Sequence, residues 1–598
     1  MFGMLVYGDL KRREVTAEKA EKIRAGLSGL GDLRPGIERH AALAGWLIEL
    51  GELEQALLDD QLAREGRERY SALTGRTGKL TRTAAELLLV SFRHRGAPRS
   101  SDHPRAGALR EVLHGLRDLR GVGVPRELSV TVPEGYAFYG LYPETYLAAA
   151  ERLREGWNGD LRVIGIRSIG TSLGALVAAA GEAEVLVTVR PEGHPFARTL
   201  SLGGRLATHL GERAEPGTLW AIADEGPGLS GSSFGSVADW LEDWGVKRES
   251  IVFFPSHAGD LGPQASERHR ERWGSARRCL VSFEELFTGP SSSWPLERWV
   301  EDLTGRVDGA AEDVSAGRWR DLLFPGGSTK PPAHLQQERR KYLLRAGGAR
   351  WLVKFAGLGR SGREKLEMSA ALAAAGFSPL VAGLRHGFLV GPWLERARPL
   401  PLASVNRREL VERVAEYVTF RAHRWPVGSE TRGASPADLL KMAEFNVGQA
   451  LGEETAEPLR VWRERLPELE AQARPVLTDN RMHAWEWLVA RDGRILKTDA
   501  VDHHAGNDLV GAQDPAWDLA GAIVELGLDE QETARLLEIA ARRGVRTTEA
   551  QLAFYKVTYL AFQLGWHHMA VQALGFATDE AERMRRAAER YGERLRQV

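Results

Sequence analysis

The stretch Leu219-Trp-Ala-Ile-Ala-Asp224-Glu225-Gly-Pro-Gly-Leu-Ser230-Gly-Ser-Ser233-Phe joins an apolar run, two adjacent carboxylates and a glycine-serine loop. The apolar run has the length of a strand and ends at Gly and Pro, whereas residues 234–244 resume with helical spacing. Free backbone N–H groups and the helix dipole at such a loop favour an anion. The carboxylates repel phosphate but accept hydrogen bonds from hydroxyls. The pattern therefore predicts a ribose diol beside the acids and a 5′-phosphate in the loop.

This stretch resembles the PRPP-binding loop of type I phosphoribosyltransferases, in which a strand, two acidic residues and a short spacer precede a Thr/Ser-Gly-x-Thr/Ser turn. The resemblance implies that Asp224 and Glu225 bind the ribose diol at the catalytic centre. It assigns the 5′-phosphate to Ser230, Gly231, Ser232 and Ser233. The spacer 226–229 is one residue longer than usual, so the alignment of the serines stays open by one position. An ordinary glycine-rich turn is the alternative.

Further strands at 161–166, 184–189 and 251–254 alternate with helical runs, which predicts a doubly wound parallel sheet. Ligands in such sheets bind at the carboxyl ends of the strands. The resemblance makes the loop after the first strand a pyrophosphate site, with three candidates: Arg167, Ser168 and Gly170.

The segment 190–204 is long, polar and ends in glycine, as a lid does. Arg198 or His194 is a candidate to close over a leaving pyrophosphate. A solvated surface role for both side chains is the alternative.

A second set of signals begins at Lys341. Two strand-like runs joined by Ala-Gly-Gly-Ala predict a hairpin, and Lys354 is flanked there by Trp, Leu, Val and Phe. A buried ammonium needs an anion, because an unpaired buried charge costs several kcal/mol, roughly. The helical run that follows offers Glu364 or Glu367. A strand lysine, a helix glutamate and ATP phosphates form the arrangement of the kinase fold.

Farther along, Thr-Asp479-Asn480 precedes Asp492-Gly-Arg-Ile-Leu-Lys-Thr-Asp499 and then Asp514-Pro-Ala-Trp-Asp518-Leu-Ala. This order resembles the aminoglycoside/choline phosphotransferase family of small-molecule kinases. The resemblance implies that Asp479 orients the acceptor hydroxyl, that Asp499 binds Mg²⁺ and that Asp518 braces the catalytic loop. Phosphoryl transfer needs little more, since positioning and charge neutralisation dominate its catalysis.

Two positions depart from that family. Leu477 stands where His is usual, and Ala484 stands where a second metal ligand, Asn, is usual. Three nearby side chains are candidates to replace it: Asn480, His483 and Glu486. The alternatives are a domain that binds nucleotide but transfers poorly, or one that binds another ligand. The adjacent pairs His503-His504 and His567-His568 point in different directions on a helix or strand, which makes metal binding by either pair a weak signal.

Composition sets the remaining expectations. A chain of 598 residues exceeds one core, which indicates several domains. The net charge of −1 gives no sign of nucleic-acid binding. The single cysteine, Cys279, excludes an intramolecular disulfide and favours a reducing, cytoplasmic setting. No apolar run reaches the roughly 20 residues that span a bilayer, and residues 1–22 lack a leader pattern, so no membrane is expected.

The sequence thus predicts an α/β and α+β multidomain protein. We expect a mainly helical region at 1–125, a phosphoribosyltransferase-like parallel-sheet core at 126–290, a Pro/Gly/Ser linker at 291–334 and a bilobal kinase-like domain at 335–598. The expected function is phosphoribosyl transfer from PRPP to a small nitrogenous acceptor together with ATP-dependent phosphorylation of a small-molecule hydroxyl, both with Mg²⁺. A nucleotide- or PRPP-binding sensor with a degenerate kinase domain is the alternative.

Overall fold

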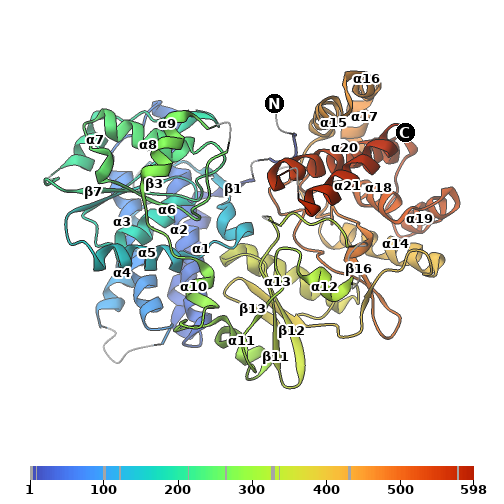
Figure 1. Cartoon of the computed structure of the whole chain (residues 1–598), viewed down its shortest axis with the longest axis horizontal. Coiled ribbons are helices and arrows are strands. Elements are labelled where there is room, and N and C mark those ends of the chain that lie inside the picture. The colour runs from blue at the N-terminus through green and yellow to red at the C-terminus, as the bar shows by residue number, and fades with distance from the viewer. Residues whose placement is uncertain are drawn as a thin grey trace.

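The structure is a computed structural model that describes residues 4–8, 10–97, 103–119, 123–212, 214–262, 265–324, 330–335, 337–428, 433–575 and 578–597. Two bodies lie side by side in it (Figure 1). We refer to residues 10–290 as the amino-terminal half and to residues 296–597 as the carboxy-terminal half.

A five-stranded parallel sheet with the order β4-β3-β7-β8-β9 forms the centre of the amino-terminal half. Both faces are covered, because neighbouring residues such as Val163 and Ile164 belong to different hydrophobic clusters. The predicted parallel sheet is confirmed. Its strands and main helices are β3 (Leu161–Ile166), α6 (Gly170–Ala180), β4 (Val185–Val189), β7 (Leu219–Ala223), α8 (Ser232–Asp243), β8 (Ile251–Phe254), α9 (Glu267–Ser275) and β9 (Arg277–Arg278).

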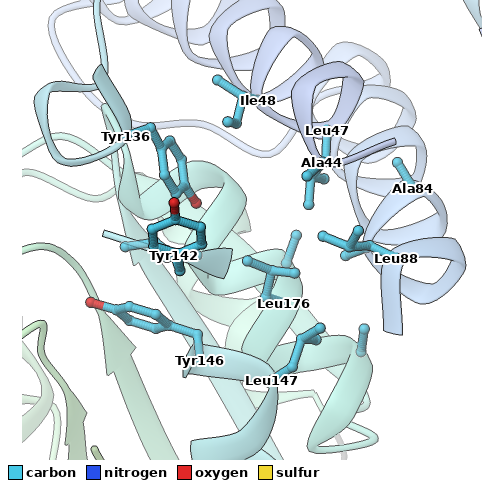
Figure 2. Packing of buried hydrophobic residues seen from close by; sticks show 14 of the residues in the cluster. Ala44, Leu47, Ile48, Ala84, Leu88, Tyr136, Tyr142, Tyr146, Leu147 and Leu176 are labelled. Carbon is cyan, nitrogen blue, oxygen red and sulfur yellow. The ribbon is translucent and has the colours of Figure 1, made fainter. Parts of the chain in front are cut away.

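Helices precede this sheet in the chain and pack on one side of it. Leu47 of α2 and Leu88 of α3 gather around Leu176 of α6 (Figure 2). The elements of this layer are β1 (Lys11–Val15), α1 (Thr16–Ser28), α2 (Ile37–Glu65), α3 (Ala72–Arg93), α4 (His103–Asp118), β2 (Glu127–Thr131) and α5 (Pro143–Glu155). β1 pairs with β2 in an antiparallel ladder. The first strand of this layer is therefore hydrogen-bonded to residues that lie beyond position 125 in the chain.

Outside the sheet, the amino-terminal half carries a hairpin and two short helices. These are β5 (Glu192–His194), β6 (Ala197–Thr199), α7 (Gly204–Gly211) and α10 (Phe283–Phe287). The hairpin occupies the segment that the sequence predicts to be a lid.

The carboxy-terminal half contains an antiparallel sheet with the order β10-β11-β12-β14-β13. The predicted hairpin is confirmed, because β11 pairs with β12 up to Ala346 and Ala349. Gly347 and Gly348 both have positive φ, as a tight turn with two left-handed residues requires. The sheet and its helix comprise β10 (Glu312–Asp313), β11 (Lys341–Ala346), β12 (Ala349–Phe355), α13 (Gly359–Ala374), β13 (Gly383–Arg385) and β14 (Phe388–Pro392).

A small sheet and a helical body complete this half (Figure 1). The sheet has the order β15-β16-β17. The elements are β15 (Arg398–Pro399), α14 (Arg407–Arg424), α15 (Pro436–Leu451), α16 (Glu453–Ala456), α17 (Leu466–Gln472), β16 (Trp487–Val489), β17 (Ile495–Lys497), α18 (Pro515–Leu526), α19 (Glu530–Arg542), α20 (Glu549–Leu574) and α21 (Asp579–Leu595).

The segment 291–334 is folded where the structure describes it, so the linker prediction is corrected. It contains α11 (Leu296–Thr304), β10 and α12 (Trp319–Leu323), while residues 325–329 lie outside the described residues. Trp299 is fully buried and Arg320 forms two 2.9 Å bonds to Glu580 on α21. The segment is rich in Pro, Gly and Ser, but burial of Trp299 and the pairing of Arg320 with Glu580 hold it against the rest of the protein.

The two halves share contacts at several points. Leu47 of α2 and Phe355 of β12 belong to one hydrophobic cluster. The Tyr142 hydroxyl donates a hydrogen bond to the His386 carbonyl at 2.8 Å. The halves therefore pack against each other through both apolar and polar contacts.

Candidate active site

A cavity of about 320 Å³ lies in the carboxy-terminal half between its two sheets. Its wall includes Lys354 from β12, together with Glu486 and Asp499 from the segments around β16 and β17. Phe138 and Tyr139 of the amino-terminal half also line it. Three of the side chains that the sequence assigns to ATP and Mg²⁺, namely Lys354, Glu486 and Asp499, thus converge on a space suited to a small ligand.

Lys354 has a different partner from the one expected. Its ammonium bonds to Asp499 and, at 2.6 Å, to Asp502. Burial alone would lower the pKa of Lys354, but these two carboxylates raise it above its ordinary value. Glu364 and Glu367 lie exposed on α13, and Glu364 pairs with Arg360, so the predicted lysine–glutamate pair is wrong in this structure.

Helical geometry explains this correction. The inward face of α13 carries Lys365, whose side chain is 4% exposed and whose ammonium lies 2.9 Å from Asp502. A residue next to Glu364 in sequence points about 100° away around a helix, so the acid faces solvent when the lysine faces Asp502. Burial, and then Arg339, lowers the pKa of Lys365 to about 8.

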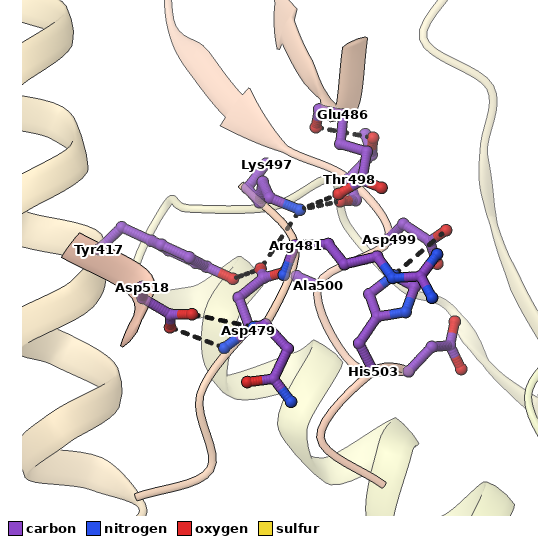
Figure 3. A network of polar contacts seen from close by, with 12 residues as sticks. Tyr417, Asp479, Arg481, Glu486, Lys497, Thr498, Asp499, Ala500, His503 and Asp518 are labelled. Carbon is purple, nitrogen blue, oxygen red and sulfur yellow. Dashed lines mark hydrogen bonds and ion pairs between the residues drawn. The ribbon is translucent and has the colours of Figure 1, made fainter. Parts of the chain in front are cut away.

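Asp479 lies behind the cavity wall and is not among the residues that line it. Its carboxylate accepts a hydrogen bond from the Tyr417 hydroxyl and lies 3.2 Å from the ammonium of Lys497 (Figure 3). Lys497 also donates to Glu486 at 2.7 Å, and its side chain is fully buried. One cation therefore joins the predicted base to a carboxylate that faces the cavity.

Asp518 has the geometry that the family resemblance implies. Its two carboxylate oxygens accept hydrogen bonds from the backbone N–H groups of Asp479, at 2.7 Å, and Asn480, at 2.9 Å (Figure 3). Asn480 has φ of +70°, a left-handed conformation that asparagine tolerates better than most residues. Asp518 on α18 therefore fixes the turn that carries Asp479.

The candidate cation ligands are Glu486, Asp499 and His503, whose ligand atoms lie within 4.8 Å of one another. Oxygen ligands with one imidazole suit a divalent cation. Burial raises the pKa of Glu486, so a bound cation would offset the cost of its charge. Asn480 does not join this group, because its side chain bonds to Thr478 at 2.7 Å and to the Gly511 carbonyl at 2.7 Å.

The two positions that depart from the family have local explanations. Leu477 acts through its backbone, which bonds to Trp425 and Arg421, both at 2.9 Å. Ala484 begins a short helical turn that ends at Glu486 and directs this carboxylate to the cavity. His483 instead lies 3.2 Å from Glu525 and stacks on Trp485.

Sequence reasoning missed Lys365, Lys497 and Asp502 as members of the site, and it gave His503 only a weak signal for metal binding as part of an adjacent pair. Lys497 carried a usable signal, because it ends a short apolar strand two residues before Asp499, and a buried ammonium there needs an anion. Asp502 carried none, since its position depends on the fold of the loop after β17.

The segment around α12 forms another part of the cavity wall. Trp319 and His334 line it, and both ring nitrogens of His334 lack a hydrogen-bond partner among the described residues. Burial lowers the pKa of His334 to about 4, so the imidazole is neutral near pH 7. It can offer one donor and one acceptor to a ligand.

A second candidate site lies at the carboxyl end of β7. Asp224 and Glu225 are half-buried, and the Glu225 carboxylate accepts a hydrogen bond from the Gly135 N–H at 3.0 Å. Burial raises the pKa of Asp224 to about 7. Burial, then the charges of Asp224 and Glu134, raises the pKa of Glu225 to about 8. Two acids held together without a neutralising lysine are a typical site for a cation or a hydroxyl-rich ligand.

The predicted phosphate loop leads into α8, as expected, and the hairpin lies across it. The hydroxyls of Ser230 and Ser232 donate to the Pro195 carbonyl, at 2.8 and 2.6 Å. Gly231 has φ of +60°, and Ser233 is the second residue of α8. Arg198 on β6 lowers the pKa of Asp224 through its charge, whereas His194 is exposed. To bind a phosphate, the hydroxyls of Ser230 and Ser232 would have to give up their hydrogen bonds to the Pro195 carbonyl.

Arg167 is not free to bind pyrophosphate, which corrects its predicted role. Its fully buried guanidinium bonds to both carboxylate oxygens of Glu68, at 2.7 and 3.0 Å, and to Asp59 at 2.8 Å. Ser168 is half-buried in the same turn. Gly170 does lie at the site, since a Cβ there would stand 2.6 Å from the Ala223 carbonyl and 3.3 Å from Asp224.

No protein-family model matches the chain, and no curated protein matches it. Solved structures that resemble it include a choline kinase from Streptococcus pneumoniae, with 16% identity and a TM-score of 0.35 over 51% of this chain and 98% of that one. A choline/ethanolamine kinase family protein from Mesorhizobium loti has 16% identity and a TM-score of 0.32 over 47% and 92%. A spectinomycin phosphotransferase in complex with ADP and spectinomycin has 12% identity and a TM-score of 0.32 over 51% and 98%.

Among the described residues, no helix has both the length and the apolar character needed to cross a membrane.

Proposed function

We propose that the carboxy-terminal half binds Mg-ATP and transfers its γ-phosphoryl group to the hydroxyl of a small molecule. The observation that carries this proposal is the convergence of Lys354, Asp499 and Glu486 on one cavity. Lys354 would contact the phosphates. Asp499 and Glu486, with His503, would hold Mg²⁺, which neutralises the charge that develops on the transferred group.

Asp479 would orient the acceptor hydroxyl. Because Tyr417 and Lys497 contact its carboxylate, this role requires Asp479 to be freed from them when the nucleotide and acceptor bind. The Asp518 brace keeps the loop backbone fixed during such a change, so only side chains need to move.

The proposal is tested by incubating the full-length protein with Mg-ATP and a cell extract of small molecules, followed by mass spectrometry for phosphorylated products. We expect a product that wild type forms and that Lys354→Ala and Asp499→Asn do not. An extract in which no compound gains phosphate, with ATP left unconsumed, would count against phosphotransfer.

A specific observation favours a second candidate, a domain that binds nucleotide without turnover. The Asp479 carboxylate is paired with Lys497, and Asp479 is not among the residues that line the cavity. Tight Mg-ATP binding with no ATP consumption in wild type, and consumption that appears in Lys497→Met, would favour this sensor function over the kinase.

For the amino-terminal half we infer binding of a ribose phosphate such as PRPP with Mg²⁺, for transfer to a small nitrogenous acceptor. Asp224 and Glu225 at the end of β7, beside Gly170 and the start of α8, support this inference. Charge-assisted hydrogen bonds contribute about 1.5–3 kcal/mol each, so Asp224→Asn should weaken PRPP binding at least about tenfold. Calorimetry on the Asp224→Asn, Glu225→Gln double variant tests this, and unchanged affinity would exclude the site.

A further inference from the structure

Asp502 stands at the centre of three cations beside the nucleotide cavity. Its carboxylate lies 2.6 Å from the Lys354 ammonium, 2.9 Å from the Lys365 ammonium and 3.1 Å from the Arg339 guanidinium. Asp502 itself is 3% exposed. Burial alone would raise the pKa of this carboxyl, but Arg339, Lys354 and Lys365 together hold it well below the ordinary value. The carboxylate thus has three cations within ion-pair distance.

One of the cations is held by the other half of the molecule. Gly135–Tyr139 form a single π-helical turn, and the Phe138 carbonyl accepts a hydrogen bond from Arg339 at 2.8 Å. The Phe138 ring lies under Arg339 and Lys365, with its centroid 5.6 and 5.5 Å from the two cations. Such cation–π contacts strengthen where water is excluded.

The charge pattern on α13 explains why a carboxylate is required there. The inward residue of this helix is Lys365, so Lys354 faces a second ammonium where a helix acid was expected. Two buried ammonium groups repel each other unless an anion lies between them. Asp502 occupies that place, and the exposed Glu364 and Glu367 cannot replace it.

We propose that Asp502, rather than an acid of α13, is the residue that positions Lys354 for the nucleotide phosphates, and that Phe138 of the amino-terminal half completes this cluster. The proposal rests on Mg-ATP binding at the cavity. When Mg²⁺ binds the Asp499 carboxylate, Lys354 keeps only Asp502 as an anionic partner, and its ammonium becomes available to the nucleotide phosphates. Asp502 then maintains the orientation of the Lys354 side chain.

The test is calorimetric titration of full-length variants with two probes, a Mg-bound non-hydrolysable ATP analogue and adenosine. We expect Asp502→Asn to weaken binding of the Mg-nucleotide about tenfold or more, because a charge-assisted contact is lost. Adenosine affinity should stay unchanged, because adenosine has no phosphate for Lys354. A general loosening of the fold would weaken both probes alike.

Glu364→Gln and Glu367→Gln are the matched controls, since a helix acid that positioned Lys354 would make one of them as damaging as Asp502→Asn. We expect neither to change the affinity for the Mg-nucleotide, and Asp502→Glu to restore part of it. Phe138→Ala, which keeps the carbonyl but removes the ring, should give the same selective loss at roughly threefold, and it serves as the second variant should Asp502→Asn not fold.

Three results separate the possible failures. A loss in Glu364→Gln or Glu367→Gln that matches Asp502→Asn would overturn the positioning role of Asp502. Equal weakening of adenosine and Mg-nucleotide in Asp502→Asn and Phe138→Ala would reduce both residues to structural supports. A wild-type protein that binds no Mg-nucleotide would remove the proposed function and this inference with it.

Discussion

At the scale of single residues, the structure separates side chains that hold the fold from side chains available to ligands. Arg167 and Arg198 lie in the same half, and the sequence predicts a pyrophosphate contact for each of them. The Arg167 guanidinium forms ion pairs with Glu68 and Asp59, whereas Arg198 lies on a hairpin near Asp224. Burial and pairing, which sequence does not show directly, distinguish the two arginines.

Arg167→Gln should therefore destabilise the protein by about 3–5 kcal/mol, because it leaves the buried Glu68 carboxylate without its guanidinium partner. Urea unfolding measures this loss. Arg198→Gln is the control and should change stability by less than about 0.5 kcal/mol while it weakens PRPP binding. The opposite pattern, with PRPP affinity lost only in Arg167→Gln, would restore Arg167 to the pyrophosphate site.

Glu225 predicts a pH dependence of stability. The folded state raises its pKa to about 8, above its ordinary value in the unfolded chain, so the folded protein retains this proton longer. Stability from this group is present at low pH and is lost as pH rises through about 8. Glu225→Gln cannot lose a proton, so we expect it to unfold at a higher temperature than wild type at pH 9 and to differ less at pH 6.

This comparison is made by thermal unfolding without ligand, and Glu192→Gln, an exposed acid on the hairpin, serves as the control. A Glu225→Gln variant that is less stable than wild type at pH 9 would show that the carboxylate is ionised and paired in the folded state. A stabilising change at a site that also loses ligand binding is typical of functional residues.

At the scale of elements, the segment around α12 closes one side of the cavity in the carboxy-terminal half. Arg320 of α12 bonds to Glu580 of α21, and Glu580 also accepts a hydrogen bond from the Ala333 N–H at 2.7 Å. This contact joins the segment to α21 of the helical body. Trp319 and His334 of the same segment form part of the cavity wall.

We expect a double-mutant cycle between Arg320→Ala and Glu580→Ala to give a coupling free energy above about 1 kcal/mol, because the two side chains are buried and share two bonds. Either single change should also speed proteolysis within residues 314–324. The exposed pair of Arg318 and Asp313 is the control, with coupling near zero. Coupling near zero for both pairs would mean that the segment is held by its aromatic side chains alone.

Elements with strong local signals were predictable, and contacts between distant segments were not. The β7–α8 unit and the β11–β12 hairpin follow from apolar runs and glycine turns. The Asp518 brace follows from family resemblance, and its bonds have that geometry. The orientation of α13 was not predictable, because Lys365 and Glu364 are equally compatible with its helical pattern. Only packing against Asp502 decides which of the two side chains points into the protein.

At the scale of the whole molecule, segments of the chain pack on both halves and one turn contacts both candidate sites. Residues 4–8 pack on the carboxy-terminal half, with Leu5 bonded to Asn446 and Val6 in its hydrophobic cluster. The chain then enters the amino-terminal half at β1. The Gly135–Tyr139 turn reaches the Glu225 carboxylate at one end and the cavity of the carboxy-terminal half at the other. The two candidate sites thus share one structural element.

The central claim is that this cavity binds Mg-ATP through Lys354 and Asp499, and thermal unfolding with and without Mg-ATP tests it most directly. At a hundredfold excess over the dissociation constant, ligand binding adds about 2.7 kcal/mol to the stability of wild type. Asp499→Asn and Lys354→Ala should lose most of this gain while they keep any stabilisation by PRPP. A wild-type protein that saturating Mg-ATP does not stabilise, or an equal gain in both variants, would contradict the account.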